Sequence, residues 1–251
     1  MLISGNRNVF NRWKKAVLSL LTAGKNHAAI PPTGNGVIVV LTQYQVQTSF
    51  QAMFTAILSA YVFSSLKAAG NIMAEAYYEQ GDTTVIWVME RWRSADFYNS
   101  NRGSGAAGAV NAFTETGDAL LREVLLMEDL VLFYGEFRKA PATGAPPLSV
   151  MLFIDVKTGA EEEFRQINQA AMPAVQQEEG LLTFQLSQVV DHKSQFVVFK
   201  KFYNREALQH HLKSPAIAPV IRFLQTSIKE PPFEKAYHHL IEFAPLYRGQ
   251  H

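Results

Sequence analysis

The chain shows the same order of hydrophobic and polar positions twice. Each copy begins with a short β-branched, apolar run that is typical of a buried strand. A longer stretch with helical spacing follows, and then two strand-like runs are joined by a tight turn. A shorter helical stretch and a final apolar run close each copy. The expected elements are residues 37–46, 48–69, 72–79, 84–92, a helix from Ser94 and 130–137, and then residues 150–156, 159–179, 182–190, 195–202, a helix from Asn204 and 237–243.

A shift of 110 positions aligns the two copies without a gap, from residue 36 to residue 134. It places Gly70 on Gly180, and each glycine is expected to adopt a left-handed conformation where the long helix ends. Pro173 predicts a kink or an interruption in the long helix of the second copy. Other identities fall on apolar positions, namely Val40/Val150, Phe54/Phe164, Ile57/Ile167, Val88/Val198, Phe113/Phe223 and Leu130/Leu240. The chain is therefore predicted to contain an internal repeat.

The order strand-helix-strand-strand-helix-strand is that of the ferredoxin-like unit, an α+β fold with both helices on one face of the sheet. Strand residues 85–89 and 196–199 are apolar on both sides, so the second face of each sheet must also be buried. We therefore predict tandem ferredoxin-like repeats packed sheet to sheet as an intramolecular dimeric α/β barrel. The predicted organisation is repeat 1 over residues 36–137, a Pro- and Gly-containing linker over 138–148 and repeat 2 over 149–251.

Composition narrows the classes of function. The chain is 48% hydrophobic and 18% charged, which is typical of a soluble globular protein, and its net charge of +1 gives no reason to expect a nucleic-acid partner. It has no cysteine, which excludes disulfides, thiolate metal sites and cysteine nucleophiles. A cytoplasmic location is expected, and the sequence leaves further association into a homo-oligomer open.

The first 35 residues differ from the rest, because they hold five basic residues and no acidic one. Apolar residues recur at helical spacing within residues 9–22 and predict a basic amphipathic helix. Its apolar run is too short to span a bilayer. Docking on the body of the protein or on a partner chain is the favoured interpretation. Peripheral membrane association through residues 9–22 and a targeting segment are the alternatives.

Two stretches carry a family resemblance. Glu90-Arg91-Trp92 follows an apolar strand, and Asn-Arg-Glu-Ala-Leu-Gln-His-His-Leu-Lys-Ser-Pro occupies residues 204–215 after the matching strand. Together they resemble the antibiotic biosynthesis monooxygenase (ABM) domain, with its Glu-x-Trp and a helix that bears a histidine and Ser-Pro. The first copy has Asn101 at the histidine position. The second keeps His211 but has Lys200 and Phe202 in place of Glu and Trp.

The resemblance implies a dimeric α/β barrel and cofactor-free oxygenation of a quinol or anthrone, so no cofactor or metal is expected. Such a reaction needs an aromatic slot and a polar group that takes a proton, because a deprotonated electron-rich phenol itself reduces dioxygen. The candidate catalytic residues are His211, Glu90 and Asn101. The candidates for binding a small aromatic substrate are Trp87, Trp92, Tyr77, Tyr98, Phe202 and Tyr203.

Structural roles are the alternatives for these residues. Aromatic residues in strands are usually core, and Trp87 and Trp92 have opposite parity, so at most one faces a given pocket. Glu90 could form a structural salt bridge and Asn101 a helix cap. His211 is the strongest candidate, because histidine titrates in the range that suits proton transfer.

Other signals do not point to a site. Residues 103–108 match a dinucleotide fingerprint, but they do not directly follow a strand, and we expect them to loosen a helix. The adjacent pairs His210-His211 and His238-His239 diverge, so neither pair chelates one metal. Two functions remain open: a cofactor-independent monooxygenase, or a non-catalytic ligand-binding or interaction module on a degenerate ABM scaffold.

Overall fold

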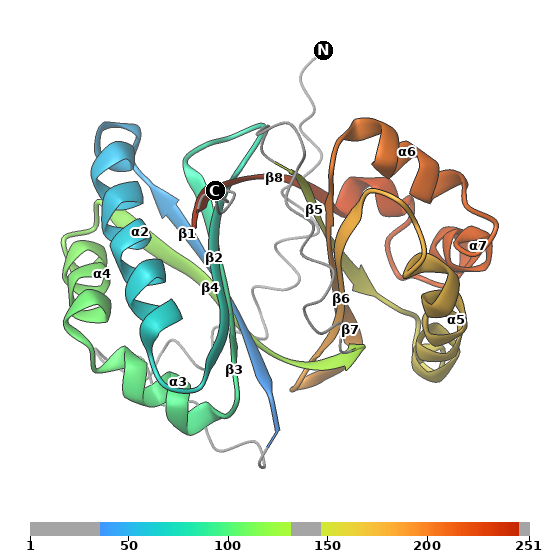
Figure 1. Cartoon of the computed structure of the whole chain (residues 1–251), viewed down its shortest axis with the longest axis horizontal. Coiled ribbons are helices and arrows are strands. Elements are labelled where there is room, and N and C mark those ends of the chain that lie inside the picture. Colours follow the sequence, from blue (N-terminus) through green and yellow to red (C-terminus); the bar gives the residue numbers. More distant parts are fainter. Residues whose placement is uncertain (1–35, 132–146, 246–251) are drawn as a thin grey trace. The chain divides into compact units, whose positions relative to one another are not determined.

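A computed structural model describes residues 36–131 and 147–245. These residues form two compact units (Figure 1). Unit 1 takes in residues 36–127 and 241–245, and unit 2 takes in residues 128–131 and 147–240. The predicted N-terminal helix over 9–22 and the linker residues up to 146 lie outside the described residues.

Unit 1 follows the predicted strand-helix-strand-strand-helix-strand order, with one additional helix. Its elements are β1 (Ile38–Val46), the 3-10 turn η1 (Thr48–Phe50), α2 (Gln51–Lys67), β2 (Asn71–Glu79), β3 (Val85–Trp92), α3 (Ala95–Arg102), α4 (Gly105–Glu115) and β4 (Ala119–Val131). Ser94 and Ser104 are the N-cap residues of α3 and α4, and the Ser104 side chain accepts a hydrogen bond from the Ala107 N–H.

Unit 2 has the same order. Its elements are β5 (Leu148–Asp155), α5 (Glu161–Val175), β6 (Leu181–Val189), β7 (His192–Phe202), α6 (Arg205–Lys213), α7 (Ala218–Thr226), the 3-10 turn η2 (Phe233–Ala236) and β8 (Tyr237–Ala244). Asn204 caps α6 as predicted, since its side-chain oxygen accepts a hydrogen bond from the Ala207 N–H at 2.9 Å. Both β4 and β8 cross the boundary between the units along the chain.

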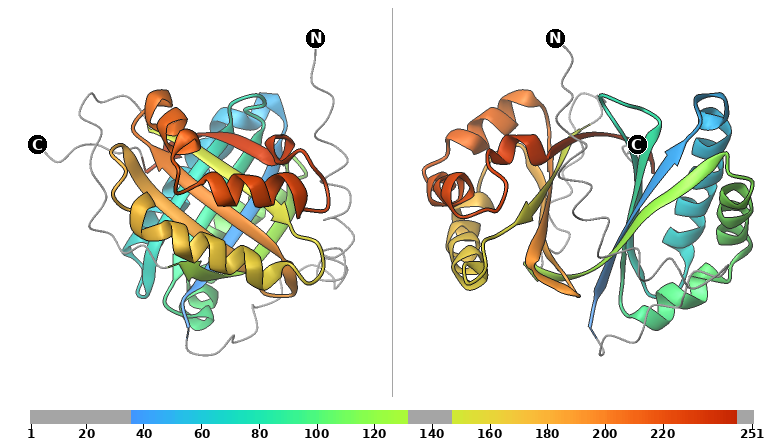
Figure 2. Two further views of the ribbon diagram at one scale, coloured as in Figure 1. Left: turned by 90° about the vertical axis from the view of Figure 1, so that its right-hand side faces the viewer. Right: turned by 180° about the vertical axis from the view of Figure 1, so that it is seen from behind.

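Within each unit the first strand is central. The strand order is β4-β1-β3-β2 in unit 1 and β8-β5-β7-β6 in unit 2, with antiparallel pairing. In unit 1, Ile38 and Asn71 both pair with Trp92, and in unit 2, Leu148 and Leu181 pair with Phe202. The helices of each unit gather on one face of its sheet (Figure 2). This is the ferredoxin-like arrangement.

Two glycines confirm the repeat register in three dimensions. Gly70 and Gly180 have φ values of +75° and +83°, as the sequence predicted. Each lies beside the short helix of its own unit, so a Cβ atom at Gly70 would sit 2.2 Å from the Phe97 ring and one at Gly180 would sit 2.7 Å from the Ala207 Cβ. Residues 97 and 207 are themselves 110 positions apart. Only glycine fits both the conformation and the close approach.

Three predicted elements differ in the structure. The last strand of the first copy begins at Ala119 instead of residue 130, because buried residues alternate along 119–127 and already form a half-buried strand. In the second copy Pro231-Pro232 occupies part of the corresponding stretch, and proline cannot donate to a sheet ladder. Pro173 does not interrupt α5, since it lies in the last turn and the helix ends at Val175. The glycine-rich stretch at 103–108 ends α3 and begins α4.

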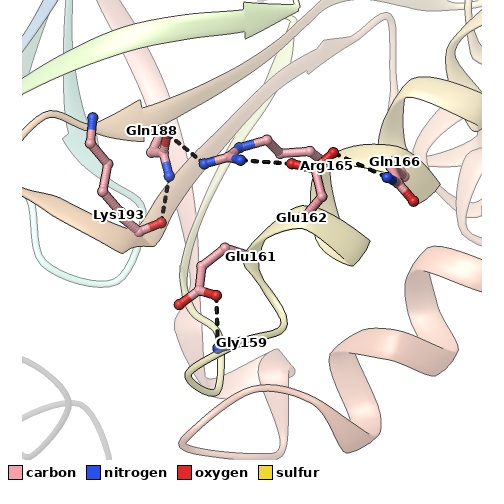
Figure 3. Close-up of polar contacts among 7 residues, drawn as sticks. All are labelled: Gly159, Glu161, Glu162, Arg165, Gln166, Gln188 and Lys193. Atoms are coloured by element: carbon pink, nitrogen blue, oxygen red, sulfur yellow. Dashed lines mark hydrogen bonds and ion pairs between the residues drawn. The ribbon is translucent and has the colours of Figure 1, made fainter.

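The long helices of the two units differ on their solvent side. α5 carries polar residues there, and Figure 3 shows Glu162 accepting a hydrogen bond from Arg165 at 2.8 Å. α2 exposes Met53, Phe63 and Leu66. By length and composition alone, the helical residues Thr48–Lys67 could cross a bilayer. In the structure one face of α2 packs in the core of unit 1 through Phe54, Leu58 and Val62, as the core helix of a soluble domain does.

Candidate functional site

Residues of one parity on β3 face the helices of unit 1. Ile86 and Val88 belong to the core cluster that includes Phe54 and Leu58 of α2. Glu90 continues this row, because side chains on a strand alternate between faces with a period of two. The row therefore places a carboxyl group in the layer between the sheet and the helices, where Glu90 is only 2% exposed.

Glu90 and Asn101 meet through two residues of α2. The hydroxyl of Tyr61 lies 3.0 and 2.9 Å from the two carboxyl oxygens of Glu90 and donates to them. The Asn101 side-chain amide donates to Ser65 Oγ at 2.9 Å and approaches the Tyr61 hydroxyl at 3.5 Å. Tyr61 and Ser65 are four residues apart on the buried side of the helix, so both reach the same point. We call Glu90, Tyr61, Ser65 and Asn101 the Glu90 cluster.

Burial dominates the electrostatics of the Glu90 cluster. Desolvation raises the pKa of Glu90 from 4.5 to about 7, against the hydrogen bond from Tyr61 and the charge of Arg102, which both lower it. Burial, followed by the charge of Glu90, also raises the pKa of Tyr61. Near neutral pH the cluster therefore holds a carboxyl group that can either accept or release a proton, while Tyr61 stays a hydrogen-bond donor.

Two aromatic rings lie in the same layer of unit 1 as the Glu90 cluster. Trp92 and Tyr98 pack edge to face with ring centroids 6.1 Å apart, and they share a core cluster with Ile38 and Val40. The Arg102 guanidinium lies 6.0 Å from the centre of the Tyr98 ring. Burial and the charge of Glu90 raise the pKa of Tyr98 above its ordinary value. Two of the six predicted aromatic residues therefore lie in the same layer as the predicted carboxylate.

Tyr77 and Trp87 lie on the other face of the same sheet. They are register partners on β2 and β3, and their parity is opposite to that of Ile86 and Val88. Their polar atoms bind carboxylates: the Tyr77 hydroxyl donates to Glu75, and the Trp87 indole N–H donates to Glu79 at 2.9 Å. The predicted separation of Trp87 from Trp92 is confirmed, and the structure does not place Tyr77 or Trp87 with Glu90.

His211 belongs to unit 2 and has partners of its own. Its Nε2 lies 2.7 Å from Lys200 Nζ, and its Nδ1 lies 2.6 Å from Glu178 Oε2. Desolvation, followed by the charge of Lys200, lowers the pKa of His211 to about 2. The ring is therefore neutral, although it lies within ion-pair distance of Glu178. In the tautomer that satisfies both contacts, Nδ1–H donates to Glu178 and Nε2 accepts from the ammonium group of Lys200.

The remaining predicted aromatic residues surround this group only in part. The centres of the Phe202 and His211 rings lie 5.3 Å apart. Phe202 also belongs to the main core cluster of unit 2. Tyr203 is half-buried beside Gly180, where its backbone N–H donates to the Gly180 carbonyl at 2.8 Å. Phe202 therefore lines the His211 group, and the Tyr203 backbone holds the turn beside it.

The two polar groups occupy equivalent positions with different chemistry. Glu90 corresponds to Lys200 and Asn101 to His211, so a carboxyl in one unit replaces an ammonium in the other. Sequence reasoning missed Tyr61, Ser65 and Glu178. The signal for the first two was a pair of polar residues four apart on the buried stripe of an apolar helix. No cluster of three or more His, Cys, Asp or Glu side chains suited to a metal occurs within residues 36–131 and 147–245.

Comparison with known proteins identifies the family. The description "antibiotic biosynthesis monooxygenase" belongs to the family model that matches residues 37–112 and again residues 147–221, together more than half of the chain. The chain belongs to this family. One match falls on each repeat, so the resemblance that rested on Glu90-Arg91-Trp92 and residues 204–215 is confirmed. No curated protein sequence matched the chain.

Solved structures of similar fold cover most of this ABM family member. A candidate monooxygenase from Lactobacillus acidophilus NCFM aligns over 82% of this chain and 94% of its own, with a TM-score of 0.70 and 13% identity. A second candidate monooxygenase, from Fusobacterium nucleatum subsp. nucleatum ATCC 25586, gives 82% and 92% coverage, a TM-score of 0.68 and 14% identity. An anthrone oxidase-like protein gives 84% and 92% coverage, a TM-score of 0.57 and 10% identity.

These similarities confirm the predicted fold class, two tandem ferredoxin-like units of the dimeric α/β barrel type within one chain. Identities this low carry the fold alone. Family membership supports a monooxygenase-like role, while the residues that act and the compound that is oxidised must be argued from the site.

Proposed function

We propose that this ABM protein is a cofactor-independent monooxygenase that oxidises a quinol- or anthrone-type aromatic compound in unit 1, with Glu90 as the general base. The observation that carries the proposal is a buried carboxyl group that accepts hydrogen bonds from Tyr61, in the same layer as Trp92 and Tyr98. Burial raises the pKa of this carboxyl group to about 7. A base of this strength is partly ionised at neutral pH and still takes up a proton readily. The anthrone oxidase-like protein of similar fold is consistent with this class of substrate.

The proposed reaction needs one proton acceptor and dioxygen. Glu90 removes a proton from the activated carbon or hydroxyl of the substrate, and the resulting anion transfers electrons to dioxygen. For an anthrone methylene the balance is one CH₂ group and one O₂ giving one carbonyl group and one water. One oxygen atom stays on the carbon, and the other leaves as water with the two hydrogens.

The neighbours of Glu90 have distinct roles in this proposal. Tyr61 orients the carboxyl group through its hydrogen bonds at 3.0 and 2.9 Å and keeps the pKa from rising further. The Asn101 amide donates to Ser65 Oγ at 2.9 Å. In this proposal Asn101 is a positioning residue, because it fixes Ser65 beside Tyr61 and Glu90. Trp92 and Tyr98 are buried and pack edge to face, so the proposal requires a planar aromatic substrate to displace part of this packing in order to stack on them.

Oxygen consumption tests the proposal. The full chain is supplied with a panel of hydroquinones and anthrones, and the rate above the buffer autoxidation rate is compared for wild type, Glu90→Gln and Glu115→Gln. Glu115 is an exposed residue of α4 and serves as the matched control. We expect Glu90→Gln to lower the rate by about 10²- to 10⁴-fold and the control to keep the wild-type rate. Absence of turnover with every compound would favour the alternative, a non-catalytic ligand-binding module.

A further inference from the structure

Unit 2 contains a chain of three hydrogen-bonded polar groups that the proposed oxidation in unit 1 does not use. Lys200 on β7 donates to His211 on α6 at 2.7 Å, and His211 donates to Glu178, which follows α5, at 2.6 Å. His211 is fully buried, and the Glu178 side chain is 7% exposed. One strand, one helix and the turn after α5 thus bring an amine, an imidazole and a carboxylate together, as in a proton relay.

The carboxylate end of this relay has room for a proton. Oε1 of Glu178 is buried, and Oε2 accepts a hydrogen bond from His211. Burial raises the pKa of Glu178, although a side-chain hydrogen bond from Ser214 opposes this shift. A buried carboxylate is costly when charged, and protonation relieves this cost. Glu178 can therefore hold a proton that arrives through the imidazole.

The amine end of this relay lies beside an aromatic ring. Lys200 Nζ lies 5.1 Å from the centre of the Phe184 ring, and Lys200 itself is only half-buried. Desolvation lowers the pKa of Lys200 to about 8, although the negative charge of Glu178 opposes this shift. The charged or titratable groups that act on this set are Glu178 after α5 and His210 and His211 on α6.

We propose that Lys200 is a reactive amine that forms an imine with an aromatic aldehyde or ketone, and that His211 and Glu178 form the relay that carries its proton. Lysine is the side chain that supplies imine-forming amines when it is desolvated in apolar surroundings. The rings of Phe184 beside Lys200 and Phe202 beside His211 favour an aromatic carbonyl compound.

The step is balanced without an oxidant or reductant. The Lys200 ammonium gives a proton to His211 Nε2 while His211 Nδ1 gives its proton to Glu178. The amine lone pair then forms a bond to the carbonyl carbon, which gives a carbinolamine after proton transfer to oxygen. The relay returns its proton to the hydroxyl group, the C–O bond breaks, and one water leaves as the C=N bond forms. This site lies in unit 2 and stands or falls independently of Glu90.

Reductive trapping of the full chain tests the assignment. The protein is incubated at pH 7 with formaldehyde, the smallest aldehyde, or with benzaldehyde, each with cyanoborohydride, and labelled lysines are located by peptide mass mapping. Lys213, an exposed residue on the same helix as His211, is the internal reference. We expect Lys200 to be labelled by both aldehydes at least about tenfold faster than Lys213, because the lowered pKa of Lys200 leaves part of its amine unprotonated at pH 7. Equal or slower labelling by formaldehyde overturns the proposal, and labelling by formaldehyde alone overturns the aromatic class of ligand.

A second variant separates the relay from simple electrostatics. Glu178→Gln removes the proton acceptor and also removes a negative charge that raises the pKa of Lys200. If the relay acts, this variant is labelled more slowly at Lys200. If only charge matters, its Lys200 has a lower pKa and is labelled faster, which contradicts the relay. Lys200→Arg should abolish the label at this position and leave that at Lys213 unchanged.

Discussion

Lys200 Nζ lies 2.7 Å from His211 Nε2, at the two positions that correspond in the other repeat to Glu90 and Asn101. A residue of the third strand of the repeat and a residue eleven positions later on the short helix thus share one buried point in both units. In unit 1 the two are linked through α2, because Tyr61 and Ser65 lie between them. In unit 2 they touch directly, since Ala171 and Val175 replace Tyr61 and Ser65.

Replacing Lys200 by methionine should restore part of the basicity of His211. The charge of Lys200 is the second cause of the low His211 pKa, after desolvation, so its removal raises the pKa from about 2 while burial still keeps it below 6.5. NMR of the imidazole resonances across a pH titration measures this change. Lys213→Met on the same helix is the control, and an equal shift in both variants would contradict a specific effect of Lys200.

Glu90 should make the protein less stable as the pH rises. Its folded pKa of about 7 is above the unfolded value of 4.5, so the folded state holds more protons between these values. The stabilisation is complete below pH 4.5 and is lost as the pH rises through 7. Relative to Glu90→Gln, the wild type should lose about 3 kcal/mol of unfolding free energy between pH 4.5 and pH 8.

Urea unfolding of both proteins at the two pH values measures this difference. The comparison is between two pH values for each protein, so any change in packing that the glutamine introduces cancels. A wild-type stability that follows the Glu90→Gln profile within error would mean that Glu90 is not protonated in the folded state at neutral pH.

Tyr61→Phe tests how the hydroxyl tunes the base. The hydrogen bond from Tyr61 lowers the pKa of Glu90, so its loss should raise that pKa further. Because the base must be ionised, the rise of kcat/KM with pH should move from about pH 7 to a higher pH. Tyr78→Phe is the matched control, since Tyr78 stacks on Phe243 instead, with centroids 5.7 Å apart. If Tyr61→Phe lowers kcat/KM at every pH but leaves the midpoint of the pH profile unchanged, Tyr61 has a purely structural role.

Much of this fold could be predicted from the sequence, because an element predicted in one copy can be compared with the aligned residues of the other. The glycines at 70 and 180, the cap at Asn204 and the opposite parity of Trp87 and Trp92 depend on local rules that hold in the structure. Ser94 does precede α3 as predicted, but its side chain forms no capping hydrogen bond. The early start of β4 was missed because the second copy has prolines in the corresponding stretch, so the repeat comparison gave a misleading boundary.

The candidate site was predictable only in part. Glu90, Asn101 and His211 could be singled out from the family signature, but the partners that determine their chemistry are not neighbours in sequence. Tyr61 lies 29 residues from Glu90, and Glu178 lies 33 residues from His211. These contacts depend on how α2 and the end of α5 cross the sheet, and periodicity alone does not give side-chain partners. The charge reversal between Glu90 and Lys200 was visible, yet its meaning depended on knowing that Glu90 is buried and that Lys200 contacts the buried His211.

Gly70 lies close to the Phe97 ring, so a side chain at position 70 should destabilise the protein. Gly70→Ala combines a positive φ with a Cβ placed 2.2 Å from the Phe97 ring, so it should cost more than the 1 kcal/mol or so that the backbone conformation alone requires. Gly117→Ala is the matched control, because Gly117 has a φ of +82° but nothing within 4 Å of its added Cβ. In a Phe97→Ala background the ring is absent, and Gly70→Ala should then cost about as much as Gly117→Ala. Thermal unfolding of the single and double variants measures the coupling. Gly70→Ala could instead lower the free energy of unfolding equally with and without the Phe97 ring. That result would show that glycine is required here by the backbone conformation and not by the close approach of Phe97.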